Sequence, residues 1–272
     1  MTSSYSYPDT DDNQVNVWLS HTSPEYRRYF LASEGRVFAR MRELIDARLG
    51  QLTGPARLLD AGCGDGRLLS ELAAPFAEVL LVEPDRARLA SAQKRAAELG
   101  YAAKTRAIAT RLEELALEVE AQVVVCSHVV QHVACARLAP LLARLRAVTA
   151  PDGLLLLTAA HSVTGFDHFD RTCLVDGAID GQVISQAEFD RLASNAMGTE
   201  LPSRIFCRPS IEQAFEAAGF APFEFRVFHL DEAPAQALAA RVADIDAYAN
   251  SSPRVQAELG VDLFVAARAR SK

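Results

Sequence analysis

Three glycines spaced two residues apart follow a short apolar run near residue 60, where Asp60 is followed by Gly62, Gly64 and Gly66. An amphipathic run resumes after them, so the local pattern predicts a strand, a tight turn and a helix. Glycine adopts backbone angles that other residues resist, and it lets a ligand approach the main chain where a Cβ would block it. The free N–H groups of the following helix point into the same space. The stretch therefore predicts a ligand-binding turn.

The spacing of these glycines does not fit a dinucleotide. That fingerprint requires G-x-G-x-x-G, and Arg67 occupies the position of its third glycine. A second apolar run, residues 78–84, contains Glu83 near its end, about 20 residues after Gly64, where an acid accepts hydrogen bonds from a ribose diol. An acid at a strand end could simply mark where the strand stops, but its distance from the glycine turn favours the binding role.

The pattern D-x-G-x-G-x-G, formed by Asp60 and the three glycines, resembles motif I of the class I S-adenosylmethionine-dependent methyltransferases. The resemblance implies S-adenosyl-L-methionine as the cofactor. Many relatives place an aspartate after the third strand to hold the adenine amino group, but Thr110, Arg111 and Leu112 stand there, which leaves a backbone N–H for the adenine. The cofactor-binding residues expected from the resemblance are Asp60, Gly62, Cys63, Gly64, Gly66, Glu83, Pro84, Arg111, Leu112 and Ser127.

Histidines occur near the expected strand ends, and residues 128–133 resemble motif IV. Methyl transfer from a sulfonium requires the nucleophile and methyl to be aligned within about 3–3.5 Å, and removal of a proton where the acceptor carries one. We predict His128 as the acceptor-facing base, with His161 and His168 as further catalytic candidates. His132 lies four residues from His128, which is also a metal-ligand spacing. A zinc protease motif would have Glu after the first histidine, where Val129 stands, so we expect no metal.

An insertion, residues 161–209, is rich in Asp, His, Phe and Arg, which fits a lid over the acceptor. In the family that the chain resembles, N-terminal helices cover the cofactor and part of the acceptor pocket. The aromatic residues of the N-terminal segment, such as Trp18, could have this role, or they could only pack the helices onto the sheet. His132 could cap a turn, and the stretch 166–171 could be a solvated loop. The acceptor-binding candidates are Tyr26, Tyr29, His132, Phe166, Asp167 and Arg204.

Strand and helix patterns alternate from residue 58 to residue 160, which predicts a parallel sheet with helices on both faces. Ligands in such sheets bind beyond the carboxyl ends of the strands, where the glycine turn, Glu83 and His128 would meet. With the resemblance, the expected fold class is α/β: a Rossmann-like, seven-stranded, mostly parallel sheet with an N-terminal helical cap and a lid insertion after the fifth strand. The expected organisation is a mobile tail (1–14), the cap (15–52) and a methyltransferase domain (53–272).

Composition limits the partners. The chain has 272 residues, half of them hydrophobic, and its 28 basic and 35 acidic residues give a net charge of −7 without a basic run, so we expect no nucleic-acid partner. Five scattered cysteines without a C-x-x-C pair indicate a reducing cytoplasm. No apolar run approaches the roughly 20 residues of a membrane helix, so no membrane partner is expected. The preference for arginine and alanine over lysine resembles a GC-rich bacterial genome.

These features predict transfer of a methyl group to an oxygen or nitrogen of a small-molecule metabolite. One alternative is a non-catalytic or regulatory protein that binds the cofactor on the same fold. Another is a protein or RNA methyltransferase, which the acidic balance and the lack of an Asn/Asp-Pro-Pro-Tyr motif after the fourth strand disfavour. The sequence specifies neither the acceptor nor the oligomeric state.

Overall fold

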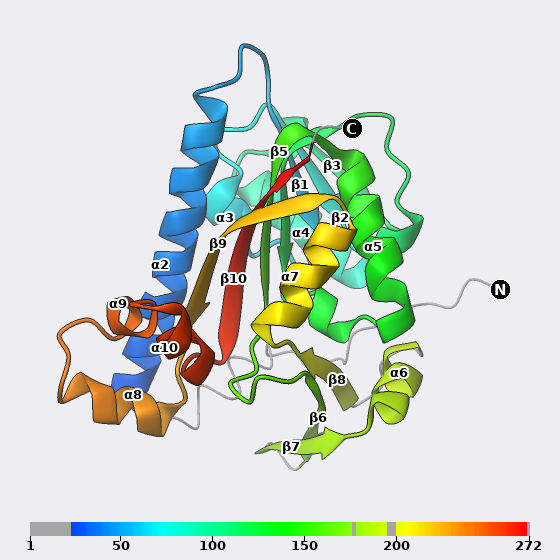
Figure 1. Ribbon diagram of the computed structural model, residues 1–272. Helices are drawn as coiled ribbons and strands as arrows, with labels where there is room; N and C mark the ends of the chain where they lie inside the picture. Colours follow the sequence, from blue (N-terminus) through cyan, green and yellow to red (C-terminus); the bar gives the residue numbers. More distant parts are fainter. Residues whose placement is uncertain (1–22, 176–177, 195–199, 271–272) are drawn as a thin grey trace.

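A seven-stranded sheet forms the centre of the molecule (Figure 1). The computed structural model describes residues 23–175, 178–194 and 200–270, so the predicted tail (1–14) and Trp18 lie outside the described residues. The strand order is β3-β2-β1-β4-β5-β10-β9, and only β10 runs antiparallel to its neighbours. The strands are β1 (Arg57–Ala61), β2 (Glu78–Val82), β3 (Thr105–Ile108), β4 (Ala121–Ser127), β5 (Thr149–Ala160), β9 (Phe220–Phe228) and β10 (Asp262–Ala269). The predicted α/β fold with a mostly parallel sheet is confirmed.

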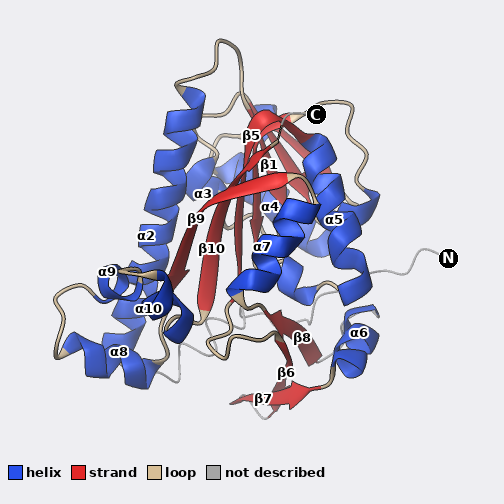
Figure 2. Cartoon of the chain, in the orientation of Figure 1, coloured by secondary structure: helices blue, strands red, loops and turns tan. Residues whose placement is uncertain are grey.

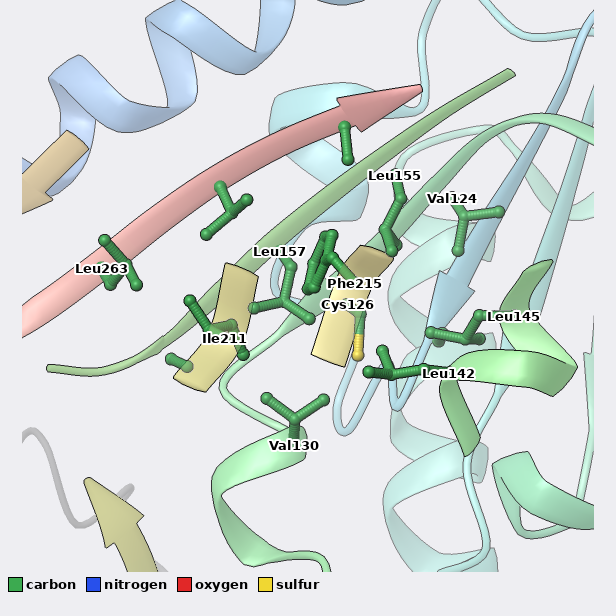
Figure 3. Close-up of a cluster of buried hydrophobic side chains, with 14 of the residues drawn as sticks. Val124, Cys126, Val130, Leu142, Leu145, Leu155, Leu157, Ile211, Phe215 and Leu263 are labelled. Atoms are coloured by element: carbon green, nitrogen blue, oxygen red, sulfur yellow. The ribbon is translucent and has the colours of Figure 1, made fainter. Parts of the chain in front are cut away.

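Helices cover both faces of the sheet (Figure 2). One face carries α2 (Pro24–Leu49), α3 (Leu69–Leu72) and α4 (Arg86–Glu98), and the other carries α5 (Cys135–Val148) and α7 (Arg208–Ala217). Each face packs against its helices in a separate hydrophobic cluster: the first lies beneath α2, α3 and α4, and the second beneath α5 and α7. Successive strand residues point to opposite faces, so Leu58 packs in the first cluster and Leu59 in the second. Figure 3 shows the second cluster, with Val124 and Leu155 of the sheet near Leu142 and Phe215 of the helices. Because both faces are covered, these strands are almost continuously apolar.

The N-terminal helix α2 begins at Ser-Pro-Glu (23–25), a sequence that is typical of a helix start. Ser23 caps it by accepting a hydrogen bond from the Tyr26 amide, and a proline occupies the first helical turn. Val37, Met41 and Ile45 recur at helical spacing and share a buried cluster with the sheet. The C-terminal half of α2 is therefore part of the main hydrophobic core.

The insertion after β5 folds as a second, antiparallel sheet of order β7-β6-β8. Its strands are β6 (His168–Val175), β7 (Ala178–Ile184) and β8 (Glu200–Ile205), and α6 (Gln186–Ser194) follows β7. Phe189 of α6 is buried and its ring centroid lies 4.9 Å from that of Phe169. In Figure 1 this unit lies beneath α5 and α7, at the end of the main sheet where β5 ends.

Residues 231–260 form three short helices, α8 (Glu232–Ala239), α9 (Ile245–Ala249) and α10 (Pro253–Glu258). Residues 234–248 have helical spacing in the sequence, but they do not form one helix, because the chain breaks after α8. Asp244 caps a new helix there, since its side chain accepts a hydrogen bond from the Ala247 amide. Short 3-10 helices complete the described elements: η1 (Ala102–Lys104), η2 (Leu112–Glu114) and η3 (Val130–His132).

Two units thus flank the carboxyl end of the parallel strands: the small sheet of the insertion is the first, and the three short helices α8, α9 and α10 form the second. β5 leads into the small sheet, β9 leads into α8, and α10 leads into β10. The N-terminus of α2 joins the second unit, because the Ser23 amide donates a hydrogen bond to Glu232. Across the described parts of the chain, no helix combines the length and apolar character needed to span a bilayer.

Candidate functional site

The glycine turn leaves β1 and folds over the end of β2. The amides of Gly62 and Cys63 both donate to the Val82 carbonyl, at 2.8 and 3.0 Å. Gly62 has φ +79°, and a Cβ there would lie 2.3 Å from a methyl of Val129. The loop after β4 therefore packs directly against the glycine turn, and only glycine allows this approach. This contact brings two segments expected at one site together.

Glu83 reaches from the end of β2 to the same turn. Its Oε2 accepts a hydrogen bond from the Gly64 amide at 3.1 Å, and its Oε1 accepts one from the Asp85 amide at 3.0 Å. Burial raises the pKa of Glu83, while these two amides and the charge of Arg88 act in the opposite direction. Each carboxylate oxygen retains a free lone pair. The group can therefore accept hydrogen bonds from two neighbouring hydroxyls.

Asp60, near the end of β1, is buried with 3% of its surface exposed. Among the described residues its carboxylate makes no hydrogen bond, and burial raises its pKa to about 7. The charge of Arg67 opposes this shift, and that of Glu83 adds to it. A buried carboxylate without a partner is stabilised by a cationic ligand group. This observation fits a ligand that carries positive charge.

His128 leaves β4 with φ +55°. Its Nδ1 lies 3.3 Å from Gln131 Oε1 and 3.8 Å from Asp262 Oδ1. The same Gln131 oxygen accepts a hydrogen bond from the Ala160 amide at 2.9 Å, so this atom is an acceptor. His128 Nδ1 must therefore carry the proton, which leaves Nε2 able to accept one. Burial lowers the pKa of His128, with Asp262 and Gln131 opposing the shift, and this favours the neutral ring, which can accept a proton.

The other candidate histidines already have protein partners. His132 Nδ1 lies 2.7 Å from the Pro202 carbonyl, and burial lowers its pKa to about 4. His161 is 5% exposed with Nδ1 3.0 Å from the Gly260 carbonyl. His168 Nδ1 lies 3.3 Å from the Ser162 hydroxyl at the entry to the small sheet. His161 lies at the same sheet end as His128, whereas His132 and His168 contact the insertion.

The two acceptor candidates of α2 form hydrogen bonds within the protein. The Tyr26 hydroxyl donates to the Leu230 carbonyl at 2.7 Å, and the Tyr29 hydroxyl accepts from the Leu230 amide at 3.1 Å. Tyr29 also lies 3.3 Å from Asp246, and burial raises the pKa of both tyrosines. These contacts join α2 to the segment after β9. An acceptor-binding role for either ring stays a prediction.

The insertion candidates are arranged around one ion pair. Asp167 accepts hydrogen bonds from the Arg204 guanidinium, from the Ser210 hydroxyl at 2.8 Å and from the Cys207 amide at 2.8 Å. These bonds lower the pKa of Asp167 although burial raises it, and they fasten the small sheet to the start of α7. Phe166, by contrast, is 77% exposed. The structure therefore pairs two residues that the sequence nominated separately.

The remaining cofactor candidates line the neighbouring strand ends. The Glu83 amide donates to the Ile108 carbonyl at 3.2 Å, which places Pro84 beside the end of β3. Arg111 and Leu112 follow β3 at the start of η2, and Leu112 is buried. Ser127, the last residue of β4, lies with its hydroxyl 2.9 Å from that of Thr158.

Three residues not nominated from the sequence also lie at this sheet end: Gln131, His229 and Asp262. Asp262 starts β10 opposite Ala160, the last residue of β5, because these strands are antiparallel. His229 follows β9, and its Nδ1 lies 2.7 Å from Asp262 Oδ2. The local sequence gives only one signal for His229 and Asp262: each is a polar residue at the end of an apolar strand. Their meeting depends on the pairing of β9, β10 and β5.

A cavity of about 410 Å³ lies at the opposite edge, at the amino ends of β1, β2 and β3. Three charged residues of its lining are engaged in the protein: Arg57 pairs with Glu78, and Lys104 Nζ donates to three backbone carbonyls around residue 74. The glycine turn and Glu83 are not part of it. The residues suited to chemistry therefore lie at the carboxyl edge.

Comparison with known proteins bears on this arrangement. A sequence model described as a methyltransferase domain matches residues 33–224, which is more than half of the chain. No curated protein sequence matches the chain significantly. Many solved structures share its fold, and their low sequence identity makes this a likeness of fold alone.

Three of these structures show how far the likeness extends. The 1,6-didemethyltoxoflavin-N1-methyltransferase of Burkholderia thailandensis, with bound S-adenosylhomocysteine, is 19% identical with TM-score 0.53, over 97% of this chain and 94% of its own. The magnesium protoporphyrin IX methyltransferase of Synechocystis PCC 6803 is 15% identical with TM-score 0.57, over 95% and 94%. An amino pentose methyltransferase from Micromonospora echinaspora, with bound S-adenosylmethionine, is 18% identical with TM-score 0.53, over 97% and 100%.

Proposed function

The chain belongs to the class I S-adenosylmethionine-dependent methyltransferases, and we propose that it methylates an oxygen or nitrogen of a small-molecule metabolite. One observation carries the assignment of the site. Glu83 is held by the amides of Gly64 and Asp85 so that both of its oxygens remain available beside the glycine turn. This is the arrangement that a nucleoside with a free ribose diol requires.

The residues at the carboxyl edge fit S-adenosylmethionine. When bound, this cofactor supplies an electrophilic methyl group on a positively charged sulfur. We assign to Glu83 the two ribose hydroxyls and to the turn around Gly64 the close approach of the methionine part. Asp60, buried and without a hydrogen-bond partner among the described residues, provides the negative charge for its cationic groups. The further contacts we propose are Gly62, Cys63, Gly66, Pro84 and Ser127, with Arg111 and Leu112 beside the adenine.

His128 is the residue we assign to the acceptor. Its Nδ1 proton faces Gln131 and Asp262, so Nε2 can take a proton from a hydroxyl or amine. Its side chain is 29% exposed, whereas His161 is 5% exposed with Nδ1 turned toward a carbonyl. His161 and His168 remain secondary candidates for the same role.

Two units would enclose the acceptor. We propose that the small sheet of the insertion acts as a lid and that the start of α2 closes the other side, which would place Tyr26, Tyr29, His132, Phe166, Asp167 and Arg204 around the acceptor. In this arrangement Asp167 and Arg204 would act chiefly by holding the lid on α7. Phe166 is the exposed apolar side chain nearest to this pair in the sequence, and it would cover an apolar acceptor.

A small acceptor is favoured over a macromolecule. The fold neighbours include enzymes named for a toxoflavin precursor, a magnesium porphyrin and an amino pentose. The net charge of −7 disfavours a polyanionic partner such as RNA. We place the protein in a bacterial cytoplasm, in line with its composition and its five free thiols. Asp60, Glu83 and the glycines argue against a decayed cofactor site. A cofactor-binding protein without transfer is the alternative, and it is less favoured because His128, with Nε2 able to take a proton, lies at the same sheet edge.

Transfer of a labelled methyl group tests the proposal. The protein is incubated with methyl-labelled S-adenosylmethionine and with cell extract separated by ultrafiltration into metabolites and macromolecules. We expect label in the metabolite fraction, and at least about tenfold less with the Glu83→Ala variant when the donor concentration is below the wild-type Kd. Label found only in protein or RNA would contradict the small-molecule acceptor. Donor binding without transfer to either fraction would favour the non-catalytic alternative.

A further inference from the structure

Asp262 lies between two histidine rings at the carboxyl edge of the sheet. Its Oδ2 is 2.7 Å from His229 Nδ1, and its Oδ1 is 3.8 Å from His128 Nδ1. Its side chain is only 16% exposed. One oxygen is thus used in a short hydrogen bond, and the other faces the histidine assigned to the acceptor.

Both histidines occupy backbone conformations that side chains rarely adopt. In the described parts of the chain, only His128, Asp152 and His229 are non-glycine residues with positive φ, at 55°, 56° and 49°. Such conformations persist where surrounding contacts impose them, and they concentrate at functional sites. The His128 amide is held by the Thr158 carbonyl at 2.9 Å, and the His229 amide by the Ser33 hydroxyl at 3.1 Å. The fold therefore maintains an unfavourable backbone conformation at the two histidines whose rings lie on either side of Asp262.

His229 is fixed more firmly than an ordinary hydrogen-bond donor. Its ring stacks on Phe30 of α2, with centroids 3.5 Å apart and planes 12° apart, and Phe228 packs at 4.6 Å. The residue is 2% exposed. Because the carboxylate accepts, His229 donates its Nδ1 proton to Asp262, and its buried Nε2 has no hydrogen-bond partner among the residues that the structure describes. A ring held in this way prevents the Asp262 carboxylate from rotating.

We propose that Asp262 is a positioning residue for His128 and that His229 braces it, an inference that rests on the proposed methyl transfer. As the acceptor atom forms its bond to the methyl carbon, the electron pair of the C–S bond stays on sulfur and the acceptor proton passes to His128 Nε2. The resulting imidazolium carries its positive charge facing Asp262 Oδ1. Gln131 Oε1 accepts the Nδ1 proton at 3.3 Å, and Asp262 Oδ1, at 3.8 Å, attracts the same edge of the ring by its charge. Asp262 thus favours the orientation that leaves Nε2 free and stabilises the charge that proton transfer creates.

Among the described charged groups that act on the His128 ring, Asp262 is the only acidic one. Burial lowers the pKa of His128, and the positive charge of Arg67 and the neighbouring His229 ring act in the same direction. His132, from the same loop, shares a repulsive interaction with it. Asp262 opposes them. Burial raises the pKa of Asp262 itself, but three histidines, His128, His229 and His161, together hold it below its usual value. Loss of this carboxylate should therefore weaken His128 as a base.

The isosteric variant Asp262→Asn tests the proposal. We expect the pKa of His128, followed by NMR in the acceptor-free protein, to fall by about one unit. We expect kcat to fall at least about tenfold, less than the about 10²–10⁴-fold loss expected for removal of the imidazole. The acid limb of the kcat profile should move to lower pH, while donor affinity stays within about twofold. Glu224→Gln is the matched control, because Glu224 is a similarly buried carboxylate whose partners are Arg40 and Arg226.

The control should lower thermal stability and leave the acid limb in place. An Asp262→Asn protein with an unchanged His128 pKa and an unchanged acid limb would overturn the proposal. The nitrogen-15 shifts of His128 in the wild-type protein provide a second measurement that needs no variant: a proton on Nδ1 is expected, and a proton on Nε2 would also overturn it. Absence of methyl transfer by the wild-type protein would instead contradict the proposed function, because the NMR titration does not depend on turnover.

Discussion

The Gly64 amide donates a hydrogen bond to Glu83 Oε2 at 3.1 Å, and this bond joins the turn after β1 to the acid after β2. Together with the Asp85 amide, it fixes the orientation of the carboxylate in the protein alone. A binding group that is already oriented loses little freedom when its ligand arrives. The two sequence features that predicted a nucleoside site are therefore one physical unit.

Replacement of Glu83 by alanine should weaken S-adenosylmethionine binding at least about tenfold, because each hydrogen bond to a charged group contributes about 1.5–3 kcal/mol. Calorimetric titration measures the affinity directly. Glu78→Ala is the matched control, since Glu78 starts the same strand and pairs with Arg57 at the opposite edge. Equal affinity in wild type and Glu83→Ala would remove Glu83 from the site.

Gly64→Ala should lose cofactor affinity out of proportion to its loss of stability. Gly64 has φ +54°, and a Cβ there would lie 2.6 Å from the Arg88 guanidinium and on the approach to the turn. Gly100 provides the control, since it has φ +75° with open space around its Cβ position. Both variants should lose about 1–2 kcal/mol of unfolding free energy from backbone strain. If Gly100→Ala lost as much affinity as Gly64→Ala, the argument from close approach would fail.

His128→Ala should lower kcat by about 10²–10⁴ with nearly unchanged donor affinity, as expected for removal of a base. His132→Ala should instead lower stability by about 1 kcal/mol, because it loses the hydrogen bond to the Pro202 carbonyl that joins η3 to β8. Steady-state kinetics and thermal melts of both variants separate the two roles. A fall in acceptor affinity alone would make His128 an orienting group, and full activity would exclude both functions.

Asp60 should make the protein less stable as pH rises. Its pKa is raised from 3.8 to about 7, so the folded state binds the proton more tightly than the unfolded state. The stabilisation from this proton is fully present below about pH 4 and is lost as pH rises to about 7. In Asp60→Asn this loss disappears, so urea unfolding should show the variant gaining stability relative to wild type between pH 5 and pH 8. Parallel pH profiles would contradict the raised pKa.

The features predicted well from the sequence are those that short stretches determine. The strand, turn and helix around Gly64 follow from local backbone preferences, and the alternation of apolar runs specifies the parallel sheet. The contact of Glu83 with the turn could also be anticipated, because the distance between them along the chain is fixed by one helix and one strand. The carboxyl edge of a parallel sheet then brings such residues together.

The features that the sequence missed depend on long-range pairing. Asp262 reaches His128 only because β10 enters the sheet antiparallel between β5 and β9, and no local signal determines that register. The pairing of Asp167 with Arg204 likewise depends on how β8 returns beside β6. Residue types in the insertion suggested ligand contacts, whereas their hydrogen bonds in the structure are to one another.

The decisive measurement for the proposed site is a structure of the protein with S-adenosylhomocysteine. We expect both ribose hydroxyls to bind Glu83 and the amino acid part to cross the turn at Gly64. We also expect the sulfur to face the space in front of His128 Nε2. A nucleoside bound elsewhere, or a sulfur that faces away from His128, would contradict the proposed site.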